Sequence, residues 1–232
     1  MFFFFHLVVG AVLGLALAGW RKDTRLLYAA ILGSALPDLI DKPLGEVLLA
    51  QSLGYGRIYF HSLIIVCVLA ITGVVLLRSR WGPAVLVTAA GMFLHQVFDE
   101  MWTEPVNWFW PFLGPFMVHH AYSSLLEGLI AEITAPSEWI FFLALIIIVV
   151  VPLAGNRRIS AKYAVIIRSI STLLPLLLGA VAIIAFLVGI RILPVSVTGL
   201  APASHNLVLA AGALIAAALL VLHSRWSATG PS

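Results

Sequence analysis

Seven apolar segments, separated by short polar stretches, constrain this chain more than any other feature. Most of them approach the about 20 residues that a helix needs to cross a hydrocarbon core about 30 Å thick. The chain is 62% hydrophobic and 10% charged, whereas a soluble domain carries about a quarter charged residues. The sequence therefore predicts an all-α, polytopic transmembrane helix bundle of about seven spans: 1–20, 26–41, 59–78, 82–100, 137–154, 168–190 and 204–222.

Two stretches depart from this pattern. The apolar part of segment 26–41 stops at Asp38, and Pro37 and Pro43 predict a helix break with free backbone carbonyls around it. Segment 105–118, PVNWFWPFLGPFMV, is apolar but is interrupted by prolines and a glycine. We expect it to form an interfacial or re-entrant loop, with its tryptophans at the level of the lipid headgroups.

The basic residues predict the topology. With seven crossings, ten bases fall on one side and three on the other, and the positive-inside rule places the richer side in the cytoplasm. The N-terminus is then outside and the C-terminus inside a plasma or inner membrane. The first segment is followed, not preceded, by its bases, which is typical of a retained helix and not of a signal peptide.

The pI near 9.3 is explained by this topology, because the bases form no stripe interleaved with aromatic residues. No nucleic-acid partner is expected, and a homo-oligomer remains possible. The single Cys67 excludes a disulfide framework. Nearly all ionisable groups outside the cytoplasmic loops lie in residues 1–135. We predict a metal-site membrane domain at 1–135 and accessory transmembrane helices at 136–232, within one integral-membrane unit.

Imidazole and carboxylate groups from four segments reach the same outer depth in this topology. His95 and Asp99 are four residues apart and share one helix face. A carboxylate at membrane depth costs about 2.5–3.5 kcal/mol on insertion scales, and neighbouring carboxylates repel, so bound divalent metal would supply the missing charge. The candidate ligands are His6, Asp38, Asp41, His61, His95 and Asp99.

These ligand types favour Zn²⁺, while a carboxylate-rich site would also accept Mn²⁺ or Mg²⁺. Six candidates exceed the needs of one tetrahedral zinc, so one or two ions are predicted. Other interpretations stay open. Asp38 fits a turn or a helix start, and the His95–Asp99 pair fits a helix-end hydrogen bond. The cluster could serve an ion-coupled transporter or a non-enzymatic metal-binding membrane protein. Whether His119, His120 or Glu127 joins it is also open.

Several short strings, in this order, carry a resemblance to a known family. They are the early His6, GSALPDLIDKPLG (33–45), GRIYFHSL (56–63), HQVFDE (95–100) and WFWPFLG (108–114). Over roughly residues 1–120 the chain resembles the membrane-bound metal-dependent hydrolases of bacteria and archaea, which include LexA-regulated inner-membrane proteins. The archaeal branch is the most similar.

The resemblance implies the same six residues as the metal and active-site set, with Arg57 at the arginine that precedes the HS motif. Gly56 stands where many members have histidine. The hydrolase label rests partly on a pattern similar to zinc-dependent phospholipase C and P1-type nucleases. The later HxxxE of those enzymes is missing, since His120 and Glu127 are seven residues apart.

The expected function is therefore a membrane metal-dependent hydrolase that acts on a lipid or lipid-linked phosphoester at the outer membrane face. Metal-activated water would be the nucleophile. Arg57, which could also be an ordinary loop base, would neutralise the phosphate. Asp41 or Glu100 would act as the general base.

Overall fold

The chain is helical throughout the part that the structure describes. The computed structural model describes residues 3–117, 125–155, 161–194 and 203–229, and no strand occurs among them. The prediction of an all-α fold is confirmed. The chain divides into two compact units, Met1–Thr134 and Ala135–Ser232, and each is described by itself.

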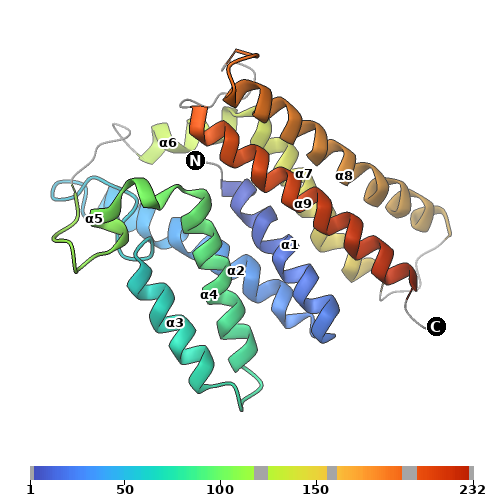
Figure 1. Cartoon of the computed structure of the whole chain (residues 1–232), viewed down its shortest axis with the longest axis horizontal. Coiled ribbons are helices and arrows are strands. Elements are labelled where there is room, and N and C mark those ends of the chain that lie inside the picture. The colour runs from blue at the N-terminus through green and yellow to red at the C-terminus, as the bar shows by residue number, and fades with distance from the viewer. Residues whose placement is uncertain (1–2, 118–124, 156–160, 195–202, 230–232) are drawn as a thin grey trace. The chain divides into compact units, whose positions relative to one another are not determined.

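The first unit contains two helix pairs, α1 with α2 and α3 with α4, and a short turn joins the helices of each pair (Figure 1). Its elements are α1 (Phe3–Arg21), α2 (Arg25–Pro43), the π-helix η1 (Leu44–Leu48), α3 (Leu63–Val75), α4 (Gly82–Phe98), the 3-10 helix η2 (Met101–Thr103), α5 (Pro105–Trp108) and α6 (Leu125–Thr134). Helix α2 packs against both α1 and α4, and α3 packs against α4. Each of the first four apolar segments thus contains one helix.

Glycines allow α4 to approach α2 closely. A Cβ at Gly33 would collide with the backbone of Thr88, and one at Gly91 would lie 2.5 Å from the carbonyl oxygen of Ala30. Small residues at such crossings let helix backbones come together in membrane proteins. This close approach brings His95, one turn beyond Gly91, to the backbone carbonyl of Ser34.

Helix α2 is not broken where the sequence predicted a break. It continues through Pro37 to Pro43 and is followed directly by η1. A proline removes one backbone donor, and a membrane helix tolerates this loss where neighbouring helices pack around it, as α1 and α4 do here. The predicted interruption was therefore wrong. Asp38 and Asp41 lie three residues apart on one continuous helix, and both are buried.

The predicted loop at 105–118 begins with a short helix, α5, and residues 109–117 after it contain no helix. Trp110 stacks on Phe116 with ring centroids 4.9 Å apart, and Tyr59 packs edge-on against both rings. These contacts hold residues 110–116 against the chain just before α3. At the tip, Phe112 is 79% exposed. The interfacial or re-entrant character of the loop stays a prediction, and its last residue, 118, is outside the described residues.

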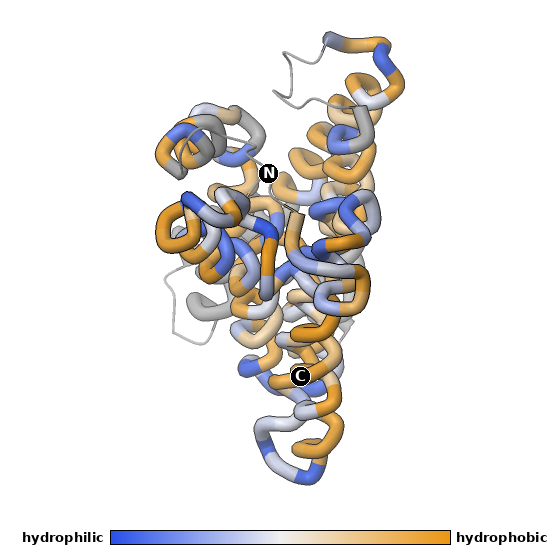
Figure 2. The backbone as a smooth tube through the Cα atoms, turned by 90° about the vertical axis from the view of Figure 1, so that its left-hand side faces the viewer, coloured by the Kyte–Doolittle hydropathy of each residue, from blue (hydrophilic) through white to orange (hydrophobic). Residues whose placement is uncertain are grey.

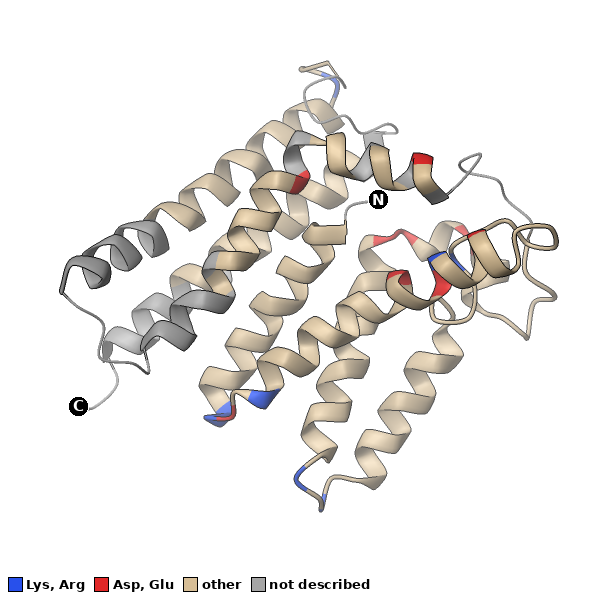
Figure 3. Ribbon diagram, turned by 180° about the vertical axis from the view of Figure 1, so that it is seen from behind, with Lys and Arg blue, Asp and Glu red and all other residues tan. Residues whose placement is uncertain are grey.

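Most charged residues of the first unit lie near its two ends (Figure 3). The turn between α1 and α2 and the turn between α3 and α4 carry most of the bases, and the opposite end carries most of the acids together with Lys42 and Arg57. Hydrophobic residues occupy most of the helix lengths between them (Figure 2). The orientation of this unit in the membrane stays a prediction.

The second unit consists of α7 (Pro136–Gly155), α8 (Ala161–Gly189) and α9 (Ala203–Thr229). Helix α8 packs against α9 and α7, and alanines such as Ala185 and Ala213 are buried in this packing. Within the described residues, α1 is the helix that is both long and apolar enough to cross a membrane, with 19 residues and a mean hydropathy of 2.0. The count of seven spans therefore stays a prediction.

Candidate metal centre

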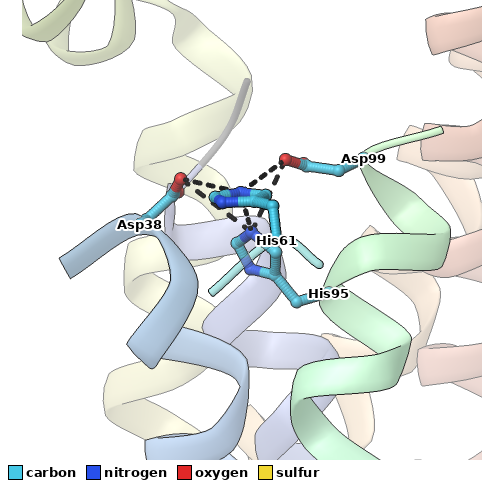
Figure 4. A group of neighbouring side chains, drawn as sticks. All are labelled: Asp38, His61, His95 and Asp99. Carbon is cyan, nitrogen blue, oxygen red and sulfur yellow. Dashed lines mark hydrogen bonds and ion pairs between the residues drawn. The ribbon is translucent and has the colours of Figure 1, made fainter. Parts of the chain in front are cut away.

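Two histidines and two aspartates converge at the acidic end of the first unit (Figure 4). Asp38 comes from α2, His61 from the turn before α3, and His95 and Asp99 from the end of α4. All four side chains are buried, with at most 4% of each residue exposed. Each offers one ligand atom, and the four atoms lie within 4.8 Å of one another.

The two imidazoles are each fixed through Nδ1. His95 Nδ1 lies 2.8 Å from the carbonyl oxygen of Ser34, and a carbonyl can only accept, so this nitrogen donates. His61 Nδ1 lies 2.8 Å from the Asp41 carboxylate and donates to it in the same way. Each neutral ring then has an unprotonated Nε2. The two Nε2 atoms are 3.2 Å apart, which turns two lone pairs toward each other.

The carboxylates add two more lone-pair donors to the same point. The oxygen Oδ2 of Asp99 is 3.3 Å from His61 Nε2 and 3.5 Å from His95 Nε2. The oxygen Oδ1 of Asp38 is 3.8 Å and 3.9 Å from the same nitrogens. Tetrahedral zinc with bonds of 2.0–2.1 Å separates its ligand atoms by about 3.3 Å. The donor set and its spacing therefore fit one divalent metal ion.

Charge leads to the same conclusion. Lys42 Nζ is 3.2 Å from the outer oxygen of Asp38, and Arg57 Nε is 3.5 Å from Asp99 Oδ2. The ion pairs around the four convergent groups include four carboxylates, Asp38, Asp41, Asp99 and Glu104, and two bases, Lys42 and Arg57. Glu100, buried beside Asp99, adds a fifth carboxyl group. With neutral histidines, one divalent cation would offset two of these negative charges. A buried excess of negative charge would otherwise be costly.

His6 belongs to the cluster without being one of the four convergent groups. Its Nε2 lies 2.9 Å from Oδ1 of Asp99, and its ring lies 4.1 Å, centroid to centroid, from the ring of His95. Since a carboxylate accepts, Nε2 donates, and Nδ1 is left without a hydrogen-bond partner among the described residues. His6 therefore orients Asp99 so that its other oxygen points at the histidines.

Asp41 lies one layer behind the four convergent groups. Its Oδ2 accepts from the backbone N–H groups of Ile58 and His61, at 3.1 and 3.0 Å, and from His61 Nδ1. The residue is fully buried. This arrangement fixes the tautomer and orientation of His61, as carboxylates behind metal-bound histidines commonly do.

Arg57 joins the cluster to a second polar group. Its Nη1 is 2.6 Å from Glu104, whose carboxylate also accepts a hydrogen bond from the hydroxyl of Tyr55. Burial lowers the pKa of Arg57, but the negative charge of Asp99, with smaller effects of Tyr55 and Glu104, raises it above the usual arginine value. The guanidinium therefore stays charged.

The remaining predicted residues are placed as follows. Glu100 is buried beside Asp99, with a left-handed backbone (φ 54°) that turns the chain into η2. Glu127 is exposed on α6 and is not among the four convergent groups. His119 and His120 lie outside the described residues.

Sequence reasoning missed three contributors. The Ser34 carbonyl has no signature in the side-chain pattern. Tyr55 and Glu104 lie in irregular segments, where no helical period marks a face. The sequence did offer one indication of their role: Tyr55 is close to Arg57 along the chain, and Glu104 is close to Asp99.

Comparisons with known proteins address the family. No curated protein and no solved structure matches the chain. Residues 1–228 match the family described as YdjM inner membrane protein, so the match extends over both units. The prediction of an inner-membrane location is thereby supported, while the hydrolase activity and the archaeal branch stay predictions. The chain belongs to the YdjM inner membrane protein family.

Proposed function

We propose that the chain is a membrane hydrolase that uses a divalent metal, and that it cleaves a lipid or lipid-linked phosphoester. One observation carries the proposal. The Nε2 atoms of His61 and His95 lie 3.2 Å apart, and two carboxylate oxygens lie beside them. The Nδ1 atom of each ring is hydrogen-bonded to another group, the Asp41 carboxylate or the Ser34 carbonyl. This donor set supports zinc, and Mn²⁺ or Mg²⁺ stays open.

Bound metal would lower the pKa of a water molecule enough to make it a nucleophile near neutral pH. The chain's own residues prepare the site for this. Ser34 and Asp41 hold the two imidazoles, and His6 holds Asp99. A hydrolase needs such groups fixed before the substrate arrives, because a rigid charged site does not have to reorganise during the reaction.

A general base must also take a proton from the nucleophile. Asp41 already accepts three hydrogen bonds at Oδ2, which assigns it to positioning His61. Glu100, buried and adjacent to Asp99, is then the better candidate for proton transfer. Activity that depends on these groups should rise with pH through the pKa of the nucleophilic water, near 7 for zinc in favourable sites.

The substrate class follows from location. The family is found in the inner membrane, and an apolar loop with exposed Phe112 and Leu113 begins just beyond the site. A site embedded in lipid is of little use for a water-soluble substrate. The topology derived from the bases would place this site at the outer face, where lipid headgroups are accessible.

The test is a screen of phospholipids and isoprenoid phosphates with wild-type protein and Asp99→Ala side by side. Product from wild type that Asp99→Ala fails to form would support the hydrolase. Product that is indifferent to Asp99→Ala would come from a contaminant. Metal-loaded protein with no product, but with metal flux in proteoliposomes, would favour the transporter instead.

A further inference from the structure

Three hydrogen-bond donors surround the carboxylate of Glu104 beside the metal centre. Tyr55 Oη lies 2.6 and 2.5 Å from its two oxygens, and Arg57 Nη1 lies 2.6 Å from Oε1. Asn107 Nδ2 is 3.5 Å from Oε2. We call these three donor residues, Tyr55, Arg57 and Asn107, the anion cradle.

Every side-chain group of the cradle that faces Glu104 is a donor. Burial raises the pKa of the Tyr55 phenol above its usual range; the positive charge of Arg57 opposes this shift, and the hydrogen bond to Glu104 adds to it. The phenol therefore keeps its proton and donates. The guanidinium of Arg57 also stays protonated, as shown above. Such a set recognises an anion, because a positive charge and hydrogen-bond donors are what carboxylate and phosphate oxygens need.

Arg57 connects the cradle to the metal centre. One edge of its guanidinium contacts Glu104, while its Nε lies 3.5 Å from Asp99 Oδ2, one of the four convergent ligand atoms. An anion in the cradle is therefore separated from the centre by a single side chain.

Glu104 is also the more accessible partner. Its side chain is 27% exposed, whereas that of Asp99 is 1% exposed. A part-exposed carboxylate can turn into water when it leaves its partner, whereas a buried one would be left as an unpaired charge. Glu104 is thus placed to be replaced by an anion that arrives from outside.

We propose that the anion cradle is the phosphate-binding subsite of this protein, and that Glu104 is an internal anion which the substrate's phosphate displaces. The identity of the molecule that carries this phosphate, a lipid or lipid-linked phosphoester, rests on the proposed function. The binding of phosphate itself does not require hydrolysis. Glu104 then sets specificity, because an anion must bind Tyr55 and Arg57 better than a tethered carboxylate does.

While Glu104 occupies the cradle, phosphate cannot bind there. The apparent Kd for phosphate is therefore the intrinsic Kd divided by the fraction of molecules in which the cradle is vacant. Removing the carboxylate should therefore raise affinity. We expect Glu104→Ala to bind inorganic phosphate about tenfold more tightly or better. Isothermal titration of phosphate into metal-loaded, full-length protein in lipid nanodiscs measures this directly.

Two further variants separate the cradle from general charge effects. Arg57→Ala added to Glu104→Ala should abolish the gain. Asp23→Ala is the matched control, since it removes a carboxylate paired with Arg25 at 2.7 Å but leaves no cradle behind. An equal gain in Asp23→Ala would show that the effect is non-specific and would overturn the proposal.

Glu104→Gln serves as a second variant, because it removes the charge and keeps the size of the side chain. A folded Glu104→Ala or Glu104→Gln with wild-type phosphate affinity would overturn the proposal. Loss of folding in both would do so as well, since Glu104 would then be a structural group that cannot leave. Tighter phosphate binding by the Glu104 variants, without hydrolysis by wild type, would contradict only the proposed function. Asp99-dependent hydrolysis, without tighter phosphate binding by the Glu104 variants, would contradict only the assignment of the anion cradle.

Discussion

The two ends of the first unit each hold an aspartate–arginine pair, and the pairs differ in what they do. Arg25 and Asp23 are 2.7 Å apart at the basic end, with side chains 45% and 26% exposed. Arg57 and Asp99 are 3.5 Å apart at the acidic end, with side chains 15% and 1% exposed. Exposed pairs contribute little to stability, whereas losing one partner of a buried pair costs about 3–5 kcal/mol. The longer pair is therefore the more consequential one.

The difference lies in how many groups share each carboxylate. Asp23 is paired with one base, Arg25, which lies two residues further along the chain. Asp99 is shared by His6, Arg57 and the two facing imidazoles. A buried carboxylate that contacts several polar side chains is characteristic of a ligand-binding site. We therefore expect substitutions around Asp99 to have the largest effects.

The largest effect is expected from His95→Ala. The substitution removes one of the four convergent ligand atoms. Substitution of a residue that only hydrogen-bonds to a metal ligand lowers metal affinity about 10–100-fold, and the loss of a ligand atom should lower it further. Elemental analysis of purified protein, followed by competition with a chromogenic chelator, measures the loss. Stoichiometric metal in this variant, with wild-type affinity, would remove His95 from the site.

Removal of the metal from wild-type protein should come next. A ligand that binds only the folded state at 100 times its Kd stabilises the protein by about 2.7 kcal/mol. We expect chelation to lower the midpoint of thermal unfolding and added metal to restore it. The His95→Ala variant is the control, because its midpoint should not respond to either treatment. A chelator-insensitive midpoint in wild type would argue against a tightly held ion.

Asp41→Asn should have an intermediate effect. The amide is a weaker acceptor for His61 Nδ1 than the carboxylate is, so metal affinity should fall by about 10–100-fold while the ligand atoms themselves remain. The matched control is Ser34→Ala. It leaves in place the backbone carbonyl that holds His95, and affinity should not change. If Asp41→Asn matched His95→Ala in size, Asp41 would be a ligand and not a positioning residue.

The sequence could predict much of this site, and the reasons are physical. Asp38, His61, His95 and Asp99 were recognisable because ionisable groups are rare at membrane depth, and the four-residue spacing of His95 and Asp99 fixes a shared helix face. The apolar runs predicted the helices for the same reason: their length and hydropathy leave few alternatives.

The rest depended on contacts that the pattern does not encode. Asp41 faces the back of His61 because α2 continues through Pro37, whereas the prolines indicated a break. The Ser34 carbonyl reaches His95 because Gly33 and Gly91 let two helices meet closely. Glu104 accepts a hydrogen bond from Tyr55, and both residues lie in irregular segments. Such contacts arise from packing between segments distant in sequence.

The smallest effect is expected at the basic end. Asp23→Ala removes the shorter of the two ion pairs, yet metal content should be unchanged and the unfolding midpoint should move by less than about 2 °C. The hydrogen bond from Arg25 lowers the pKa of Asp23 below its usual value. A carboxyl with a lowered folded-state pKa stabilises the protein above its unfolded pKa, and that contribution is lost as the pH falls through the lower value. Any difference between the variant and wild type should therefore be present at neutral pH and shrink below about pH 4. A midpoint shift as large as that of metal removal would mean that exposure does not decide what these pairs contribute, and the contrast between the two ends would fail.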